Sequence, residues 1–191
     1  MYRTEHWKKV LKEELSEKRY HHSLNVAAAA KELAALNGYD EEKAYFAGLL
    51  HDMCKEKPPE KQKQWAEKSG YYIDPAELCS EKLWHGIAAA YVLKEKHDIK
   101  DEDILNSIRF HTVARGEMSL LEEIIYVADF ISADRKMTCV HAVRALAKED
   151  LKLAVLAELQ FSIKSTIDKG GSIPLSTFEA YNRYIKYHIE K

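Results

Sequence analysis

A histidine and an aspartate stand side by side at the end of an apolar segment, in the stretch AYFAGLLHDMCKEKPPE that begins at Ala44. Imidazole nitrogens and carboxylate oxygens are common ligands of divalent metal ions. Both residue types are also common near the ends of helices. The pair His51 and Asp52 is therefore compatible with a metal site or with an ordinary helix terminus, and only further residues of the same kind favour the first interpretation.

Three more histidines fall on the apolar faces of expected helices. Residues three and four apart share one face of a helix, so we expect His22, His85 and His111 to point inward. Their apolar partners at these steps are Val26, Ala29, Leu33 and Leu36 for His22, then Ala88, Ala89 and Val92 for His85, and Ile104 and Ile108 for His111. Taken singly, each could be a hydrogen-bonded core histidine. The remaining histidines are expected at the surface: His6, His21, His97, His141 and His188.

Asp129 lies in the segment LLEEIIYVADFISADRK, on the same helix side as Leu121, Ile125 and Ala128. An ionised carboxylate without a partner is strongly disfavoured in such a place, so we expect a cation beside it. The complete inward set is His22, His51, Asp52, His85, His111 and Asp129.

The composition of this set indicates which ions it suits. Four imidazoles and two carboxylates, without a thiolate, favour iron, manganese, cobalt or zinc. Six protein ligands exceed what one catalytic ion uses while positions stay open for water and substrate. The set therefore predicts two metal ions, with Asp52 as their bridge because a carboxylate has two oxygens.

Four basic residues flank the expected ligands: Arg19, Lys55, Arg115 and Arg135. Lys55 follows His51 by four residues and is expected on the same helix face. Lys55 is too near the proposed metals to be only a surface charge. Each of the three arginines is either a solvated surface charge or a cation that binds phosphate, the anion that guanidinium groups commonly bind.

The elements that must position these side chains are helices. Apolar residues recur at steps of three and four, and the chain has only seven glycines and four prolines. We predict an all-α fold in a single domain, residues 1–191, with Gly38 ending one helix and Asp40 and Asp101 opening others. Capping boxes are expected at Ser119 with Glu122 and at Ser176 with Glu179. The predicted helices are 3–15, 17–37, 41–54, 59–69, 75–81, 84–97, 102–112, 120–133, 149–169 and 177–189.

Composition restricts the partners and the compartment. A net charge of -2 gives no overall attraction to nucleic acid or anionic lipid, and no apolar run approaches the roughly 20 residues that cross a bilayer. We therefore expect neither a nucleic-acid nor a membrane partner. Three cysteines without a CxxC pair suit reduced thiols in a cytoplasm. The sequence does not specify the oligomeric state, and a homodimer is compatible with it.

Five ordered blocks resemble the HD-domain metal-dependent phosphohydrolases, whose pattern is H…HD…D. They are RYHHSLNVA, AGLLHDMCK, LWHGIAAAYV, RFHTVARGEMSLLEEIIYVADFISADR and LSTFEAYNRYI. More closely, they resemble the YqeK family of symmetrical diadenosine tetraphosphate hydrolases, over nearly the entire chain. The resemblance implies a helical bundle, a di-iron centre held by the six inward residues, and hydrolysis of the dinucleotide to two ADP.

Metal-assisted hydrolysis of such a substrate would give individual residues their roles. Asp52 and Asp129 would orient the attacking water as well as bind metal, and Lys55 would act with them. The tetraphosphate would be held by Arg19, Lys55, Arg115 and Arg135. One block departs from the family pattern, because His-Thr-Thr-Gly-Arg-Pro is replaced here by His-Thr-Val-Ala-Arg-Gly, from His111 to Gly116.

Two other functions compete with this interpretation. The first is an HD phosphohydrolase that acts on nucleoside monophosphates or another nucleotide. The second is a metal-binding or nucleotide-binding helical module without activity, which is disfavoured because the complete ligand set, Lys55 and Arg115 are all present. The sequence contains neither a phosphate-binding glycine loop nor a dinucleotide-binding fingerprint, so adenine recognition has no assigned residues.

Overall fold

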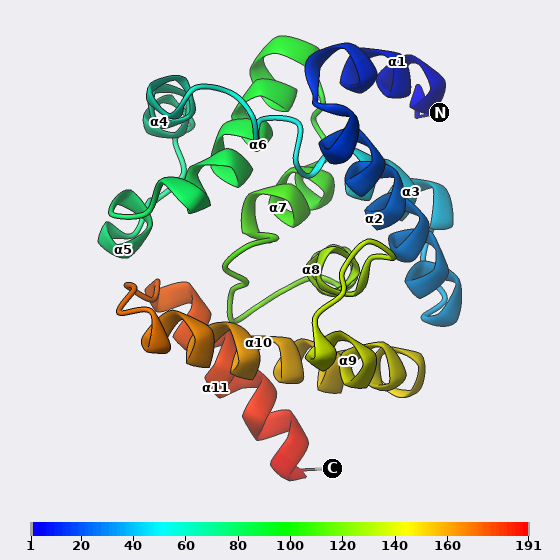
Figure 1. Cartoon of the computed structure of the whole chain (residues 1–191), viewed down its shortest axis with the longest axis vertical. Helices are drawn as coiled ribbons and strands as arrows, with labels where there is room; N and C mark the ends of the chain where they lie inside the picture. Colours follow the sequence, from blue (N-terminus) through cyan, green and yellow to red (C-terminus); the bar gives the residue numbers. More distant parts are fainter. Residues whose placement is uncertain (1, 191) are drawn as a thin grey trace.

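The computed structural model describes residues 2–190, which contain eleven α-helices, one short 3₁₀ helix and no β-strand (Figure 1). The prediction of an all-α fold is confirmed. In chain order the elements are α1 (Thr4–Glu14), α2 (Glu17–Leu36), α3 (Glu41–Leu50), α4 (Pro59–Lys68), α5 (Pro75–Leu78), η1 (Glu81–Leu83), α6 (Trp84–His97), α7 (Glu102–Phe110), α8 (Leu120–Ile131), α9 (Thr138–Glu149), α10 (Leu151–Asp168) and α11 (Leu175–Glu190). No helix of the described residues is long and apolar enough to span a membrane.

Several predicted helix ends are confirmed by their local chemistry. The side chain of Asp40 accepts a hydrogen bond from the Lys43 backbone N–H at 2.9 Å, and that of Asp101 accepts one from the Asp103 N–H at 3.1 Å. Such caps satisfy donors that have no partner within the helix. Gly38, just after α2, has φ 65°, a left-handed conformation that glycine adopts without strain.

The two predicted capping boxes differ from the structure. Ser119 does cap α8, since its Oγ accepts from the Glu122 N–H at 3.2 Å, but the Glu122 carboxylate binds Arg115 instead of returning to the cap. The prediction for Ser176 is wrong: α11 begins at Leu175, one residue earlier. A distant residue satisfies the start of this helix, because the Leu175 N–H donates to the Asp74 carboxylate at 3.2 Å.

One helix was missing from the prediction. Residues 138–149 form α9, in which Val140, Val143 and Ala147 are buried at steps of three and four. Leu146 is partly buried three residues after Val143, so the sequence does carry a helical pattern here that the prediction overlooked. The helix predicted for 149–169 begins instead at Leu151, because Asp150 caps it.

The helix predicted for 41–54 ends at Leu50, and this earlier end shapes the site. Tight turns follow, with backbone hydrogen bonds from Met53 N to Leu50 O and from Lys55 N to Asp52 O. The His51 imidazole takes the carbonyl of Gly48 as its partner at 2.7 Å. The turn therefore places His51 and Asp52 at the end of α3 rather than along its side.

Close packing of small residues brings the site-bearing helices together. α2 packs on α3 and α8, and α7 packs on α6 and α8. A Cβ atom at Gly48 would lie 3.0 Å from the Ala27 Cα, and one at Gly86 would lie 3.0 Å from the Ile108 carbonyl oxygen. Side chains at these positions would push α3 from α2 and α6 from α7. At the C-terminal end of the molecule, α10 packs against α8, α9 and α11 (Figure 1).

Candidate metal centre

The structure brings all six predicted ligand residues into one cluster. His22 comes from α2, His51 and Asp52 from the end of α3, and the others from the start of α6, the end of α7 and the last turn of α8. The side chains of five are at most 5% exposed, and that of Asp129 is 19% exposed. The cluster is thus buried in the helical core and open to solvent beside Asp129.

The two carboxylate oxygens of Asp52 face different imidazoles. Oδ2 lies 3.4 Å from His51 Nε2 and 3.7 Å from His22 Nε2. Oδ1 lies 3.1 Å from His85 Nε2 and 3.7 Å from His111 Nε2. Asp52 therefore stands between two pairs of histidines.

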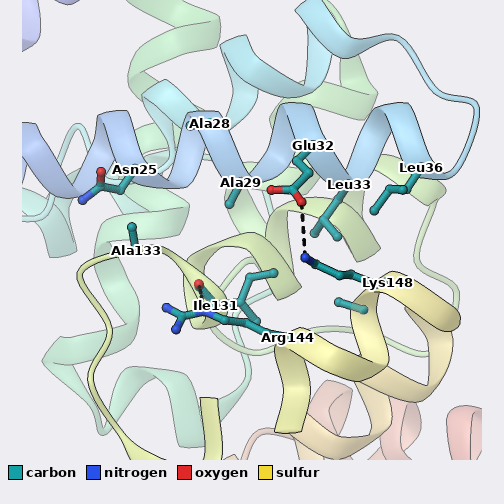
Figure 2. Close-up of a pocket in the computed structure, with 11 residues that line it drawn as sticks. Asn25, Ala28, Ala29, Glu32, Leu33, Leu36, Ile131, Ala133, Arg144 and Lys148 are labelled. Atoms are coloured by element: carbon teal, nitrogen blue, oxygen red, sulfur yellow. Dashed lines mark hydrogen bonds and ion pairs between the residues drawn. The ribbon is translucent and has the colours of Figure 1, made fainter. Parts of the chain in front are cut away.

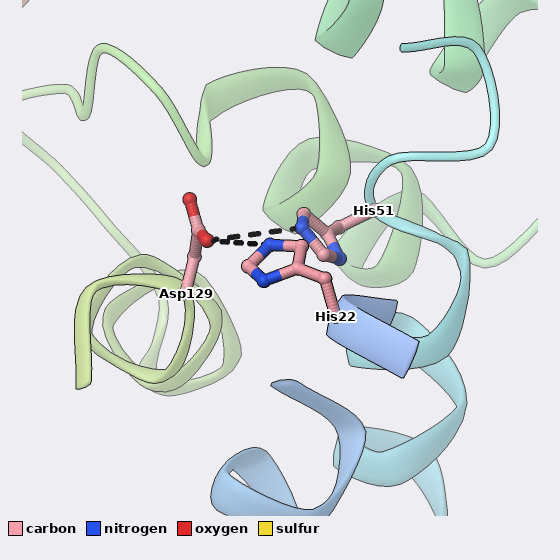
Figure 3. Close-up of side chains that lie close together, drawn as sticks. All are labelled: His22, His51 and Asp129. Carbon is pink, nitrogen blue, oxygen red and sulfur yellow. Dashed lines mark ion pairs between the residues drawn. The ribbon is translucent and has the colours of Figure 1, made fainter. Parts of the chain in front are cut away.

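Asp129 completes one of these groups. Its Oδ1 lies 3.0 Å from His22 Nε2 and 4.0 Å from His51 Nε2, and Figure 3 shows the three side chains pointing toward one another. Within two sets of three residues, ligand atoms lie within 4.8 Å of each other: His22, His51 and Asp129, and His51, Asp52 and His111. Such spacing allows three atoms to approach one ion.

The hydrogen bonds around the cluster leave metal-binding atoms free. Nδ1 of His51 and Nδ1 of His111 each lie 2.7 Å from a backbone carbonyl oxygen, so in the neutral imidazole Nδ1 carries the proton and Nε2 keeps its lone pair. His22 Nε2, His51 Nε2 and Asp52 Oδ1 are buried without a hydrogen-bond partner among the described residues. Buried polar atoms are rarely left unpaired, so this donor set fits divalent metal ions.

The electrostatics of the cluster also suit metal binding. Burial lowers the pKa of His85 to about 4, so this imidazole is neutral near pH 7 and can donate its lone pair. Burial opposes a charge on Asp52, yet His51 and the other nearby imidazoles hold the Asp52 pKa well below its ordinary value. For Asp129, burial is likewise outweighed by the neighbouring His22 imidazole and by His51 and Arg135, and the pKa is lowered. Both carboxylates are ionised at neutral pH.

Three of the four predicted phosphate-binding cations lie at this cluster. Arg19 Nη1 contacts Asp52 Oδ2 at 2.6 Å, and Arg135 forms an ion pair with Asp129. The ammonium of Lys55 lies 3.3 Å from both ring nitrogens of His85. These side chains place positive charge beside Asp52, Asp129 and His85.

Arg115 lies elsewhere. It binds both oxygens of Glu122, at 2.7 Å and 2.5 Å, and its guanidinium lies 4.9 Å from the centre of the Phe110 ring. Just before it, Ala114 has φ 58°, a strained left-handed conformation at the position where the resembled family has glycine. The altered loop therefore adopts the backbone conformation that glycine would favour.

We expect Arg115→Ala to lower the free energy of unfolding by about 1–3 kcal/mol, because the Glu122 carboxylate, 1% exposed, would lose its charged partner. Burial already raises the pKa of Glu122, and Arg115 opposes this rise. A raised folded-state pKa means that protonation favours folding, so the loss should be largest near pH 7 and shrink as the pH falls. Urea unfolding followed by circular dichroism measures both effects.

The double variant Arg115→Ala/Glu122→Gln serves as the control, since it removes the isolated charge and should regain much of the stability. An Arg115→Ala variant as stable as the wild type would show that the pair contributes nothing. Steady-state hydrolysis by the same variant tests the separate prediction that Arg115 binds phosphate.

The sequence prediction missed Asp134. Its Oδ2 lies 2.8 Å from His22 Nδ1, and its Oδ1 accepts a hydrogen bond from Asn25 at 3.2 Å. By holding the Nδ1 proton of His22, Asp134 directs Nε2 toward Asp129. The only signal in the sequence is an acidic residue in the loop after α8, which gives no hint of a contact 112 residues away.

Arg144 on α9 holds the loop that carries Asp134 and Arg135. Its Nε donates to the Ile131 carbonyl at 2.8 Å, and its Nη2 donates to the Ser132 carbonyl at 2.7 Å. Arg144 lines a groove of about 450 Å³. Figure 2 shows this side chain between α2 and α9. Helix α9, which the prediction missed, thus supports the loop next to the proposed metal centre.

We expect Asp134→Ala to weaken metal binding about 10- to 100-fold, the usual effect of removing the partner of a ligating histidine. Manganese titration of metal-free protein measures the affinity without relying on activity. Asn25→Ala is the matched control, because Asn25 contacts Asp134 but no proposed ligand. An unchanged affinity in Asp134→Ala would mean that His22 needs no such partner.

Other predicted positions are mostly confirmed. His6, His21, His97, His141 and His188 are exposed, as expected. Leu36, assigned to the inward face of α2, is 54% exposed because it lies in the last turn, beyond the packed part of the helix.

A comparison with protein families matches the model described as HD domain to residues 19–134. The chain belongs to the HD domain family. The matched region runs from Arg19 to Asp134 and contains every proposed ligand.

Known relatives and a solved structure extend this result to most of the chain. A protein of Bacillus subtilis named symmetrical bis(5′-nucleosyl)-tetraphosphatase is 37% identical over 90% of this chain and 92% of its own length. A Staphylococcus aureus protein of the same name is 37% identical over 73% of this chain and 72% of its own length. The crystal structure of a predicted HD superfamily hydrolase involved in NAD metabolism, from Clostridium acetobutylicum, has a TM-score of 0.92 at 41% identity and covers 98% of this chain and 99% of its own.

Proposed function

We propose that this chain hydrolyses diadenosine tetraphosphate symmetrically to two ADP at a centre of two metal ions. The observation that carries the proposal is the position of Asp52, whose two oxygens face two separate pairs of histidines. The names of the Bacillus subtilis and Staphylococcus aureus relatives support the choice of substrate. Iron is the first candidate for both ions, with manganese, cobalt and zinc as alternatives.

In this proposal His22, His51 and Asp129 would hold one ion, His85 and His111 would hold the other, and Asp52 would contribute to both. When bound, ions in such a site polarise a phosphoryl oxygen and make water more acidic. Asp129, the most exposed ligand, orients the attacking water from the open side. The four histidines are buried, so solvent does not reach the cluster through the helical core.

The cations beside the cluster bind the part of the substrate that does not react. Arg19, Lys55 and Arg135 bind the non-reacting phosphates and offset the charge of the tetraphosphate. Arg19 and Arg135 are 26% and 35% exposed, so their guanidinium groups are accessible to a substrate. Three cations can bind several phosphate groups at once, so a polyphosphate fits them better than a single phosphate does.

Product analysis tests the proposal. Anaerobically purified protein, with its metals measured, should convert diadenosine tetraphosphate into ADP alone, as resolved by chromatography. ATP and AMP in equal amounts would overturn symmetrical cleavage. Turnover of nucleoside monophosphates without turnover of the dinucleotide would replace the proposal by a nucleotidase.

We further propose that residues 1–191 work as one domain, because α10 packs on α8 of the matched region and on α9 and α11 beyond it. The cytoplasm is the proposed compartment, where Cys54, Cys79 and Cys139, all free thiols here, would stay reduced.

A further inference from the structure

A second cavity lies next to the metal centre, on the side of His85 and His111. Its volume is about 460 Å³, within the range of small-molecule sites, and α10, the loop before α11 and the ends of η1 and α7 line it. Lys82 precedes His85 by three residues, Thr112 follows His111, and Tyr126 lies one turn before Asp129 on α8. Three of its walls are therefore continuous with segments that carry proposed ligands.

The charged residues that line this cavity are all basic. Lys82 and Lys169 line it, and the described lining residues include no aspartate or glutamate. Seven lining residues carry hydroxyl groups. On a chain of net charge -2, this combination favours an anionic ligand that also presents hydrogen-bonding groups.

Thr112 supplies the most specific sign of a ligand. Its Oγ1 is buried and has no hydrogen-bond partner among the described residues. A buried hydroxyl without a partner is unfavourable, whereas neighbouring hydroxyls are paired: Thr177 donates to the Val113 carbonyl and Thr166 to the Ser162 carbonyl. Thr112 therefore has a free hydrogen-bonding group at the wall nearest His111.

We infer that this cavity binds the nucleoside-phosphate end of the substrate, with Lys82 and Lys169 toward phosphate and Thr112 toward ribose or phosphate oxygen. The inference rests on the proposed function: a dinucleotide whose central phosphates lie at the metal centre must place its nucleosides in adjoining space. It assigns nucleotide-binding residues that the sequence did not identify.

Binding of ADP tests the assignment without turnover. Isothermal titration of metal-loaded protein should show the dissociation constant for ADP rising about tenfold or more in Lys169→Ala and in Lys82→Ala, as expected for a hydrogen bond to a charged group. Thr112→Val should raise it about threefold to tenfold, and Thr112→Ser should restore it. The constant for inorganic phosphate should stay within about twofold in all of these variants, because phosphate binds at the metal centre.

Lys164→Ala is the matched control, since Lys164 is exposed on α10, the helix that ends just before Lys169, but lines no part of the cavity. Metal content and circular dichroism establish that each variant is folded and loaded. The subsite is overturned if all three variants bind ADP like the wild type, even when diadenosine tetraphosphate is cleaved to two ADP. If the dinucleotide is not cleaved but ADP binding falls as expected, the proposed function fails and the subsite stands.

Discussion

Asp52→Ala is expected to abolish hydrolysis and to reduce bound metal from two equivalents to less than one. Both proposed ions depend on this side chain, since one oxygen faces His51 and the other faces His85 at 3.1 Å. Losing the electrostatic stabilisation of the reacting phosphate should lower kcat/KM by about 10³-fold or more. The fold should survive, because the substitution also removes a buried charge.

Elemental analysis after anaerobic loading with iron, together with product chromatography, measures both effects. Asp168→Ala is the matched control, since Asp168 is an exposed aspartate at the end of α10. Asp52→Asn keeps the shape and one ligand oxygen, so it should retain more metal than Asp52→Ala. Two equivalents of metal in Asp52→Ala would exclude Asp52 as the bridge, and full activity would exclude it from the site.

The inward positions of the ligands could be predicted because burial follows helical periodicity. His22, His85 and His111 each lie three or four residues from apolar neighbours, and those steps place side chains on one face. The caps at Asp40 and Asp101 were predictable for a related reason, since each depends on donors two or three residues away.

What the sequence could not predict depends on contacts between distant segments. Even Arg115, which flanks the proposed ligand His111, binds Glu122 seven residues later across the α7–α8 loop, whose conformation the spacing does not specify. Asp134 meets His22 only because α8 crosses α2. Similarly, Leu175 could not be identified as the start of α11, since its partner Asp74 lies 101 residues earlier.

Lys55→Ala is expected to lower kcat/KM about tenfold to a thousandfold while leaving the metal content unchanged, the effect of losing one charge-assisted contact in the transition state. Its ammonium lies 3.3 Å from the His85 ring nitrogens yet belongs to neither group of proposed ligands. Burial lowers the pKa of Lys55, and Asp52 opposes this change. A polyphosphate bound at the centre would add negative charge beside the same ammonium and favour its protonated form.

Lys57→Ala provides the control, because Lys57 is two residues away and its ammonium is held by Glu14 at 2.8 Å. Lys55→Arg separates charge from shape: a guanidinium keeps the charge but needs more room than an ammonium, so activity should fall between those of wild type and Lys55→Ala. If Lys55 only filled space beside His85, the arginine variant would be the more damaged of the two. Unchanged kinetics in Lys55→Ala would show that Lys55 does not act on the substrate. Loss of metal in that variant would mean that Lys55 supports His85 rather than the substrate.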